Sequence, residues 1–343
     1  MNSSSGSQDG KKKSDQSGAF SGVPVRSAPP AAERDDGVSG TITVVLLAGT
    51  LSPSPLRAAI QIPVLCLPLG RDRTVLDAWL RVLKDIGGLA DVRVVGNDWP
   101  DDGRLVRASI AASPFTDNGH ANVRPVTDPA AWRGTAGIVH DVTADLPADA
   151  VILVIESHML PPDDLGPVLD PMNGAVDGIV GVSGVDTPAG VYAFRRAAFA
   201  DVSGVGYIDL KEQLLPQLAQ DGANVRVAPI GNVVVRLREL EGYLDAVVRD
   251  FARHGTDTQR IARDASVSGS AMVDGTCIIE SGAVVEDGAV VHDSVILRGA
   301  TIGGGAIVSR SLVGPLATVR PRTSHVGEVV AARRGRRRRV AEG

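Results

Sequence analysis

The first chemical pattern in the sequence is Gly134-Thr135, which directly precedes an apolar stretch with the spacing of a helix. The N–H groups at a helix start have no partner within the helix, so a glycine and a hydroxyl residue there suit a contact with a phosphate or a nucleobase. A tight helix start without a ligand explains the same residues equally well. Both interpretations stay open at this point.

A second charged pattern is the run at 333–339, which contains six arginines in seven residues. Such a run would bind acidic or phosphate-rich surfaces, but in a net acidic chain a solvated or self-associating tail is an equal alternative. The shorter run Lys11-Lys12-Lys13 is interpreted as part of a solvated tail. We therefore expect no nucleic-acid partner.

Composition limits the classes of protein that this chain can be. Its 343 residues carry a formal net charge of −5, and 43% are hydrophobic although only 3% are aromatic, which suits about two aliphatic-cored domains. Two cysteines, Cys66 and Cys277, exclude a disulfide framework or a thiolate zinc site built from this chain alone. No apolar run reaches the roughly 20 residues that span a bilayer, and the polar N-terminus lacks a secretory signal. We expect a cytoplasmic protein with no membrane partner.

Strands and helices alternate after a polar tail at 1–38 that is too poor in apolar residues to fold. Ile42 to Leu47 is a continuous aliphatic run, as in a strand covered on both faces. Thr74 can cap a following helix, with Asp77 near its positive end and Gly87-Gly88 beyond it. Further strands are predicted at 92–95, 150–155 and 190–194, and further helices at 136–146, 209–220 and 237–254. This order predicts a Rossmann-like α/β domain with a mostly parallel sheet.

After Ile261 the sequence has a period of six. Aliphatic residues recur at Ile261, Val267, Val273, Ile279, Val285, Val291 and Leu297, and small residues follow four positions later at Ala265, Ala271, Cys277, Ala283, Ala289 and Thr301. The register slips by one at Ile302 and then resumes. This pattern predicts a parallel β-helix of about three coils, because a meander of antiparallel strands would need no fixed period.

An α/β domain followed by a short left-handed parallel β-helix resembles the nucleotide-sugar pyrophosphorylases, that is, the sugar-1-phosphate nucleotidyltransferases, including the mannose-1-phosphate guanylyltransferase type. The resemblance covers roughly residues 41–319 and rests on VVLLAG at 44–49, WRGTAG at 132–137, DLKEQLLPQL at 209–218 and EGYLDA at 241–246. It implies a nucleotidyltransferase-like domain at 39–256, a β-helix at 257–325 and a basic tail at 326–343. It also implies nucleotide contacts by Ala48, Gly49, Gly134, Thr135 and Ala136.

The family transfers a nucleotidyl group from a nucleoside triphosphate to a sugar-1-phosphate with Mg²⁺ held by two aspartates, and the sequence departs from its charged positions. Arg57 is the one nearby cation that could replace the arginine of the glycine-rich loop, while the expected lysine falls on Val64. The first metal aspartate corresponds to His158 and the second to Arg236. An imidazole is a poor Mg²⁺ ligand and a guanidinium cannot be one.

Two interpretations follow from these departures. The catalytic site has decayed, which leaves a non-catalytic subunit that binds a nucleotide or nucleotide sugar or supports a partner. Alternatively a rearranged site survives, in which Glu156 or Asp141 supplies a carboxylate and Arg57 with Arg236 supplies positive charge. Mg²⁺ is expected only for an active enzyme, and no residue is assigned as a metal ligand. The first interpretation is slightly preferred because three separately placed charges are lost.

A third hypothesis concerns His292, which lies within the six-residue repeats. Hexapeptide acyltransferases use a histidine base at the cleft between β-helices of a trimer, so a resemblance to them implies acyl transfer. About three coils offer little groove, which makes this the weakest of the three alternatives. In every case the β-helix is expected to form a homo-oligomer.

Overall fold

The computed structural model describes residues 41–48, 54–70, 74–96, 102–116, 122–128, 132–184, 187–231, 234–255 and 257–332. The expectations for the tail at 1–38, for Gly49 and for the arginine run at 333–339 lie outside these residues.

The N-terminal half contains one mixed sheet with the strand order β3-β2-β1-β4-β6-β5-β7. Neighbouring strands are parallel except around β6, which is antiparallel to both β4 and β5. The strands are β1 (Ile42–Leu47), β2 (Leu89–Gly96), β3 (Asn122–Thr127), β4 (Val151–Glu156), β5 (Gly178–Ser183), β6 (Thr187–Arg195) and β7 (Val225–Pro229). The α/β class and the parallel core are as predicted, and β6 adds an antiparallel ribbon.

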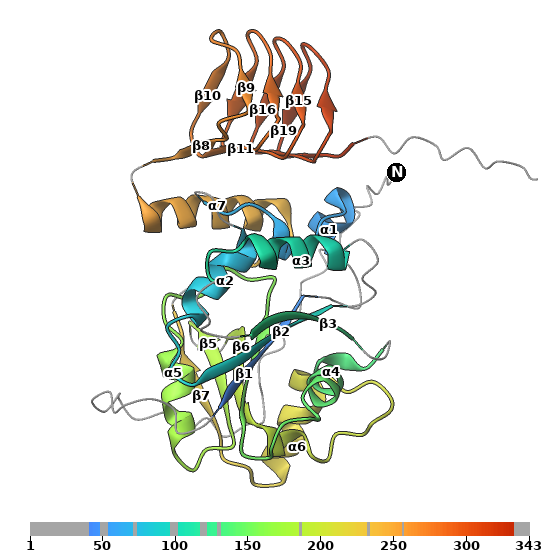
Figure 1. Cartoon of the computed structure of the whole chain (residues 1–343), viewed down its shortest axis with the longest axis vertical. Coiled ribbons are helices and arrows are strands. Elements are labelled where there is room, and N and C mark those ends of the chain that lie inside the picture. Colours follow the sequence, from blue (N-terminus) through green and yellow to red (C-terminus); the bar gives the residue numbers. More distant parts are fainter. Residues whose placement is uncertain are drawn as a thin grey trace, which may run out of the picture.

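Helices cover both faces of this sheet (Figure 1). Along β1, Val44 and Leu46 belong to one apolar cluster, whereas Val45 and Leu47 belong to the other, because successive side chains of a strand point to opposite faces. The first cluster contains residues of α1 (Pro55–Ile60), α2 (Val75–Leu83), α3 (Asp102–Ala112), α5 (Gly166–Leu169) and α7 (Leu240–His254). The second contains residues of α4 (Gly134–Val142) and α6 (Leu215–Gln220).

The starts of two helices follow from their capping residues. Thr74 Oγ1 accepts the N–H of Asp77 at 3.2 Å, which is the cap that the sequence predicts before α2, and Asp77 Oδ2 accepts the N–H of Thr74 at 2.9 Å, which completes a reciprocal capping box. Asp209 caps the segment predicted at 209–220 by accepting from Lys211 N at 2.7 Å. That segment is not one α-helix, because a π-helical turn η4 (Leu210–Leu214) precedes α6.

The C-terminal part is a parallel β-helix with three sheets, in the strand orders β10-β13-β16-β19, β20-β17-β14-β11-β8 and β18-β15-β12-β9. Ile278 pairs with Val295 and Val295 with Leu312, so each coil stacks on the next. The strands are β8 (Gln259–Ile261), β9 (Ser266–Val267), β10 (Met272–Asp274), β11 (Cys277–Ile279), β12 (Val284–Val285), β13 (Val290–His292), β14 (Val295–Ile296), β15 (Thr301–Ile302), β16 (Ile307–Ser309), β17 (Leu312–Val313), β18 (Thr318–Val319), β19 (Ser324–Val326) and β20 (Val329–Val330). The coils continue five residues past the predicted end at 325.

The register change within the β-helix falls earlier than the sequence analysis expected. After Val291 the next aliphatic residue in the inner core is Ile296, five positions on, so Leu297 does not occupy an inner slot. The shorter corner is made by Asp293 at φ 45° and by Ser294, whose hydroxyl accepts the N–H of Ser311 at 3.0 Å. The one-residue change of register that the sequence predicts at Ile302 therefore occurs between Val291 and Ile296.

One sheet of the β-helix lies against the N-terminal half. Its outward residues Ile278, Val295 and Leu312 are fully buried in the same apolar cluster as Tyr243 and Val247 of α7. Figure 1 shows α7 lying along this face, with α1 near its far end. Among the described residues, no helix combines the length and apolarity needed to cross a membrane.

Candidate functional site

The candidate site lies at the carboxyl ends of β1 and β4. These neighbouring strands end together, since Leu47 and Glu156 are in register, and Ser157 donates from its hydroxyl to Leu47 O at 2.7 Å. In the sheet, β1 lies between β2, which is the next strand in the chain, and β4. The crevice outside the carboxyl ends at such a reversal of strand order is where open α/β sheets bind ligands.

Glu156 is the centre of a cluster of polar side chains. Its Oε1 lies 2.5 Å from Lys211 Nζ and accepts a hydrogen bond from the Tyr192 hydroxyl at 3.1 Å. Its Oε2 lies 3.6 Å from His158 Nε2, beyond hydrogen-bond distance. The Glu156 side chain is 11% exposed. The carboxylate is therefore already neutralised by a cation of the same chain.

The pKa values agree with this charge assignment. Burial acts most strongly and would raise the pKa of Glu156, but the charge and hydrogen bond of Lys211, together with His158 and the hydrogen bond from Tyr192, lower the pKa below its usual value. Burial lowers the pKa of His158 to about 4, and Arg238, Arg236 and Lys211 add to this effect against the attraction of Glu156. His158 is neutral at pH 7, and its buried Nε2 has no hydrogen-bond partner.

Arg236 lies next to this cluster. Its backbone forms a bridge with Met159, and the following residue, Leu237, donates its N–H to His158 O at 2.7 Å. The structure therefore brings together Glu156, His158 and Arg236, three of the four predicted catalytic residues. Arg57 lies on α1, beside β20 of the β-helix, rather than in this cluster.

The predicted nucleobase motif makes contacts within the chain. Ala136 N and Gly137 N donate to Ile208 O at 3.0 and 3.3 Å, and Thr135 Oγ1 donates to Asp209 Oδ2 at 3.0 Å. Gly134 has φ +72°, and a Cβ there would lie 2.4 Å from Ile208 O. The tight helix start explains the described contacts of this motif. Base binding by Gly134, Thr135 and Ala136 stays a prediction.

The remaining predicted positions are engaged as follows. Ala48 donates its N–H to Val95 O at 2.7 Å, and Gly49 lies outside the described residues. Asp141, the alternative carboxylate, accepts from Arg133 Nε at 2.7 Å and lies 2.8 Å from His140 Nδ1. Hydrogen bonding by Arg133 lowers the pKa of Asp141. Asp141 therefore has a structural partner of its own.

The described residues do not fit a magnesium site. Mg²⁺ needs a near-octahedral set of oxygen ligands, usually including carboxylates. Nowhere in the part of the chain that the structure describes do three or more His, Cys, Asp or Glu residues gather as a metal site would require. Glu156 is the carboxylate that contacts Tyr192 and lies beside His158, and its Oε1 is already paired with Lys211.

Sequence reasoning did not identify Lys211 or Tyr192 as site residues. Lys211 has the ordinary place of a residue at a helix start, and Tyr192 that of a buried strand residue. They reach Glu156 only through the fold, because η4 and β6 are distant from β4 in the chain. A lone acidic residue at the end of a buried strand was the available signal that a cation must lie nearby.

Comparison with known families concerns the C-terminal part. Residues 249–343 match the family described as GlmU-like, C-terminal hexapeptide. This segment is similar to GlmU-like hexapeptide domains. The match includes the last turn of α7 and all strands from β8 to β20, so it agrees with the β-helix seen in the structure. No curated protein matched the chain. The hexapeptide domain does not extend over the mixed sheet, where the nucleotidyltransferase resemblance rests on the motifs alone.

Proposed function

We propose that this chain is a nucleotidyltransferase-like protein that binds a nucleotide or nucleotide sugar at the carboxyl ends of β1 and β4 without carrying out metal-dependent transfer. It would act as a regulatory or scaffold subunit and would associate with copies of itself through the β-helix. A surviving transferase with a rearranged site is the alternative that the same motifs allow.

The observation that carries this proposal is the 2.5 Å contact between Lys211 Nζ and Glu156 Oε1. Removing the ammonium would leave the Glu156 carboxylate, which is 11% exposed, without a cation, so the pair is stabilised by the cost of breaking it. A metal would have to displace the ammonium to bind Oε1 of this carboxylate. The neutral His158 and the exposed Arg236 at the other expected positions offer no replacement anion.

A nucleotide or nucleotide sugar remains the expected ligand because cations are available near the cluster. Arg236 and Arg238 are exposed, and both act on the pKa of His158, which places their charges near the end of β4. Guanidinium groups bind phosphate oxygens with two parallel hydrogen bonds. An anionic ligand could therefore be held here without a metal.

Calorimetric titration of the full chain with a panel of nucleoside triphosphates and nucleotide sugars, with and without Mg²⁺, tests the proposal. We expect saturable binding that is independent of Mg²⁺ and about tenfold weaker in Arg236→Met. Arg263→Met is the matched control, because Arg263 is also exposed but lies in the β-helix. Binding that requires Mg²⁺, or the absence of binding to every member of the panel, would refute it.

Acyl transfer is a second candidate because of the surroundings of His292. Its Nδ1 lies 3.4 Å from Asp274 Oδ2 and its Nε2 lies 3.1 Å from Asp293 Oδ2, and the side chain is 42% exposed. Histidines placed beside carboxylates can act as general bases. Consumption of acetyl-coenzyme A that is lost in His292→Ala would support this function, and equal consumption by His325→Ala would serve as the control.

A further inference from the structure

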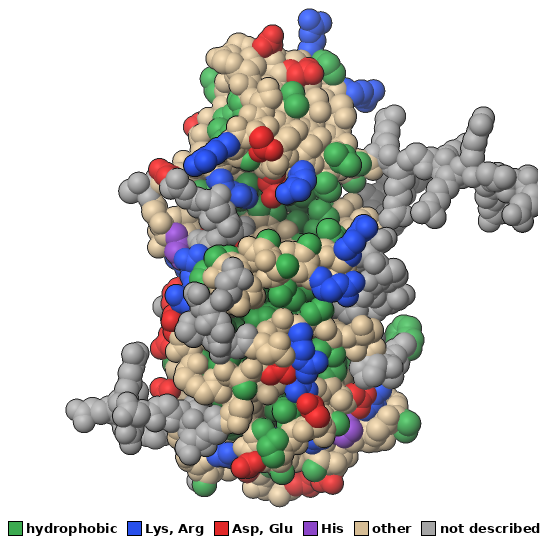
Figure 2. Space-filling model, in the orientation of Figure 1, with side chains coloured by type: hydrophobic (Ala, Val, Ile, Leu, Met, Phe, Trp, Pro, Cys, Tyr) green, Lys and Arg blue, Asp and Glu red, His purple; other side chains and the backbone are tan. Residues whose placement is uncertain are grey.

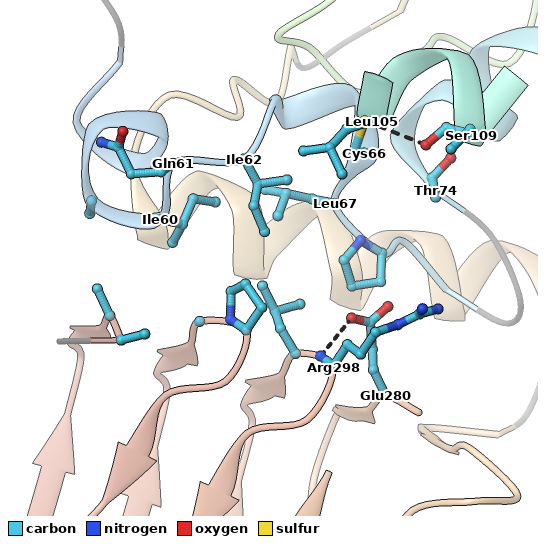
Figure 3. A pocket seen from close by; sticks show the side chains of 18 of the residues that line it. Ile60, Gln61, Ile62, Cys66, Leu67, Thr74, Leu105, Ser109, Glu280 and Arg298 are labelled. Carbon is cyan, nitrogen blue, oxygen red and sulfur yellow. Dashed lines mark hydrogen bonds between the residues drawn. The ribbon is translucent and has the colours of Figure 1, made fainter. Parts of the chain in front are cut away.

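The corner of the β-helix that faces away from the N-terminal half is a free surface. It lies between the sheets β18-β15-β12-β9 and β10-β13-β16-β19, and Figure 2 shows acidic and basic side chains at this upper end of the molecule. The third sheet is covered by α7, and Figure 3 shows Glu280 and Arg298, at another corner, across a cavity from Ile60 and Leu67. We call the turns at 286–288, 303–305 and 320–322 the outer corner.

The outer corner changes charge along the axis of the β-helix. Glu286 and Asp287 are exposed in the turn between β12 and β13, whereas Arg320 and Arg322 are exposed in the turn between β18 and β19. One turn separates these two, so about 10 Å lies between the acidic and the basic pair at the usual spacing of strands. Within the described part of the chain, neither arginine forms an ion pair. Each end of the corner therefore presents charge that a partner can neutralise.

The turn between the two charged turns carries no side chains, because it consists of the three glycines at 303–305. Another backbone can approach closely at such a place. Beside this turn, Met272, Val290 and Ile307 form an outward row across β10, β13 and β16, in which Met272 is 61% and Ile307 is 44% exposed. Exposed apolar residues flanked by charges match the core and the polar rim of a protein interface.

We infer that the outer corner, together with Ile307, binds a second copy of this chain about a two-fold axis near Gly304, with the two β-helices running in opposite directions. A two-fold axis brings the same patch of both copies together. In this direction Asp287 faces Arg322 of the partner subunit, and Ile307 packs against Ile307 of the partner subunit. Packing in the same direction, in a dimer or a trimer, would place Asp287 of every copy at the same level, where the carboxylates repel each other.

Sedimentation equilibrium of the full chain without nucleotide tests the surface. We expect a dimer that dissociates more readily at high salt, because salt screens exposed charges. Ile307→Asp should weaken dimerisation by about tenfold or more, since it places two carboxylates opposite each other at the axis. Leu316→Asp is the control, because Leu316 is 75% exposed but lies in the turn between β17 and β18, and its dimer affinity should stay within about twofold of the original.

This inference rests on the self-association in the proposed function, to which it adds the surface and the direction of packing. A chain that stays monomeric at every concentration would overturn both. A trimer, or a dimer that Ile307→Asp weakens no more than Leu316→Asp does, would overturn the inference and leave self-association standing. Nucleotide binding is measured separately by calorimetry, so neither result bears on it.

Charge reversal tests the direction of packing. Asp287→Arg and Arg322→Glu change exposed side chains, and circular dichroism verifies that both variants are folded. Each variant alone should dimerise about fivefold more weakly or worse, because the facing residues at 287 and 322 then carry the same charge. An equimolar mixture should recover most of the original affinity, since both facing pairs again join opposite charges. A mixture that dimerises no better than either variant alone would contradict the antiparallel arrangement and with it the inference.

Discussion

Lys211 Nζ lies 2.5 Å from Glu156 Oε1, so a cation from η4 is fixed at the end of β4. This is two residues before the position at which the nucleotidyltransferase resemblance implies a metal ligand, now His158. The same carboxylate accepts a hydrogen bond from Tyr192, whose pKa is raised well above its usual value mainly by burial. The cluster is thus a closed, charge-balanced group rather than an open set of metal ligands.

Replacement of Lys211 tests the importance of this pair. Lys211→Met should lower the free energy of unfolding by about 2–3 kcal/mol, because it leaves the Glu156 carboxylate buried without a cation. Adding Glu156→Gln to this variant should restore part of the loss. Urea denaturation measures both effects, and Lys84→Met is the control, since Lys84 is 40% exposed and lies 3.9 Å from Asp85. Equal losses in the two lysine variants would contradict the role of the pair.

Acid should destabilise the protein through His158. Its pKa is about 4 in the folded chain and near 6.5 when unfolded, so the unfolded state binds more protons between these values and stability falls as the pH decreases from 6.5 to 4. The lowered pKa of Glu156 adds a loss at still lower pH.

His158→Gln should remove the first of these losses. Between pH 8 and pH 5, the original chain should lose about 2 kcal/mol more unfolding free energy than the variant. Urea denaturation at the two pH values measures the difference, with His254→Gln as the control because the His254 side chain is 37% exposed. Equal losses of unfolding free energy in the original chain and in His158→Gln between the two pH values would show that burial does not keep His158 neutral.

Substitution of Gly134 should lower the stability of the fold for a reason unrelated to nucleotide binding. Gly134→Ala combines φ +72° with a Cβ 2.4 Å from Ile208 O, and we expect a loss of about 3 kcal/mol or more. Gly206→Ala is the matched control, since Gly206 has φ +85° but no atom within 4 Å of its Cβ, and it should lose only about 1 kcal/mol. Thermal unfolding compares them. Similar melting temperatures for both variants would mean that the contact with Ile208 is relieved at little cost.

Arg133 should contribute more than a surface arginine. It is 3% exposed and bonds Asp141, Ser203 O and Gly206 O, which fixes the loop before η4 beside α4. Arg133→Met should cost about 3 kcal/mol, whereas Arg249→Met, which breaks an exposed pair with Asp245, should cost less than about 0.5 kcal/mol. Chemical denaturation of both variants decides this, and a small loss for Arg133→Met would be the contrary result.

Elements with strong local signals were predicted correctly from the sequence. The aliphatic run of β1, the Thr74–Asp77 cap of α2 and the repeating coils of the β-helix each depend on neighbouring residues or on a fixed period. The short strands β3, β5 and β7 were not predicted. β3 contains Pro125, β5 contains Gly178 and Gly181, and β7 is an edge strand of five residues, so their residue types carry little strand signal.

The candidate site was only partly predictable. Glu156 ends the buried strand β4 and His158 lies two residues beyond it, and the comparison with the nucleotidyltransferase motifs made both of them candidates. Lys211 belongs to a turn of π-helix, and no local sequence pattern predicts that this turn brings its side chain to Glu156. The position of Leu297 was wrong for a similar reason, because the five-residue step at the corner around Asp293 depends on hydrogen bonds between successive coils.

The most direct test of the central claim is release of pyrophosphate from nucleoside triphosphates mixed with sugar-1-phosphates and Mg²⁺. The closed pair of Lys211 and Glu156 predicts no release above the rate without protein. Mg²⁺-dependent release by the original chain that disappears in Glu156→Gln would contradict it, because Glu156 would then serve a metal-assisted reaction.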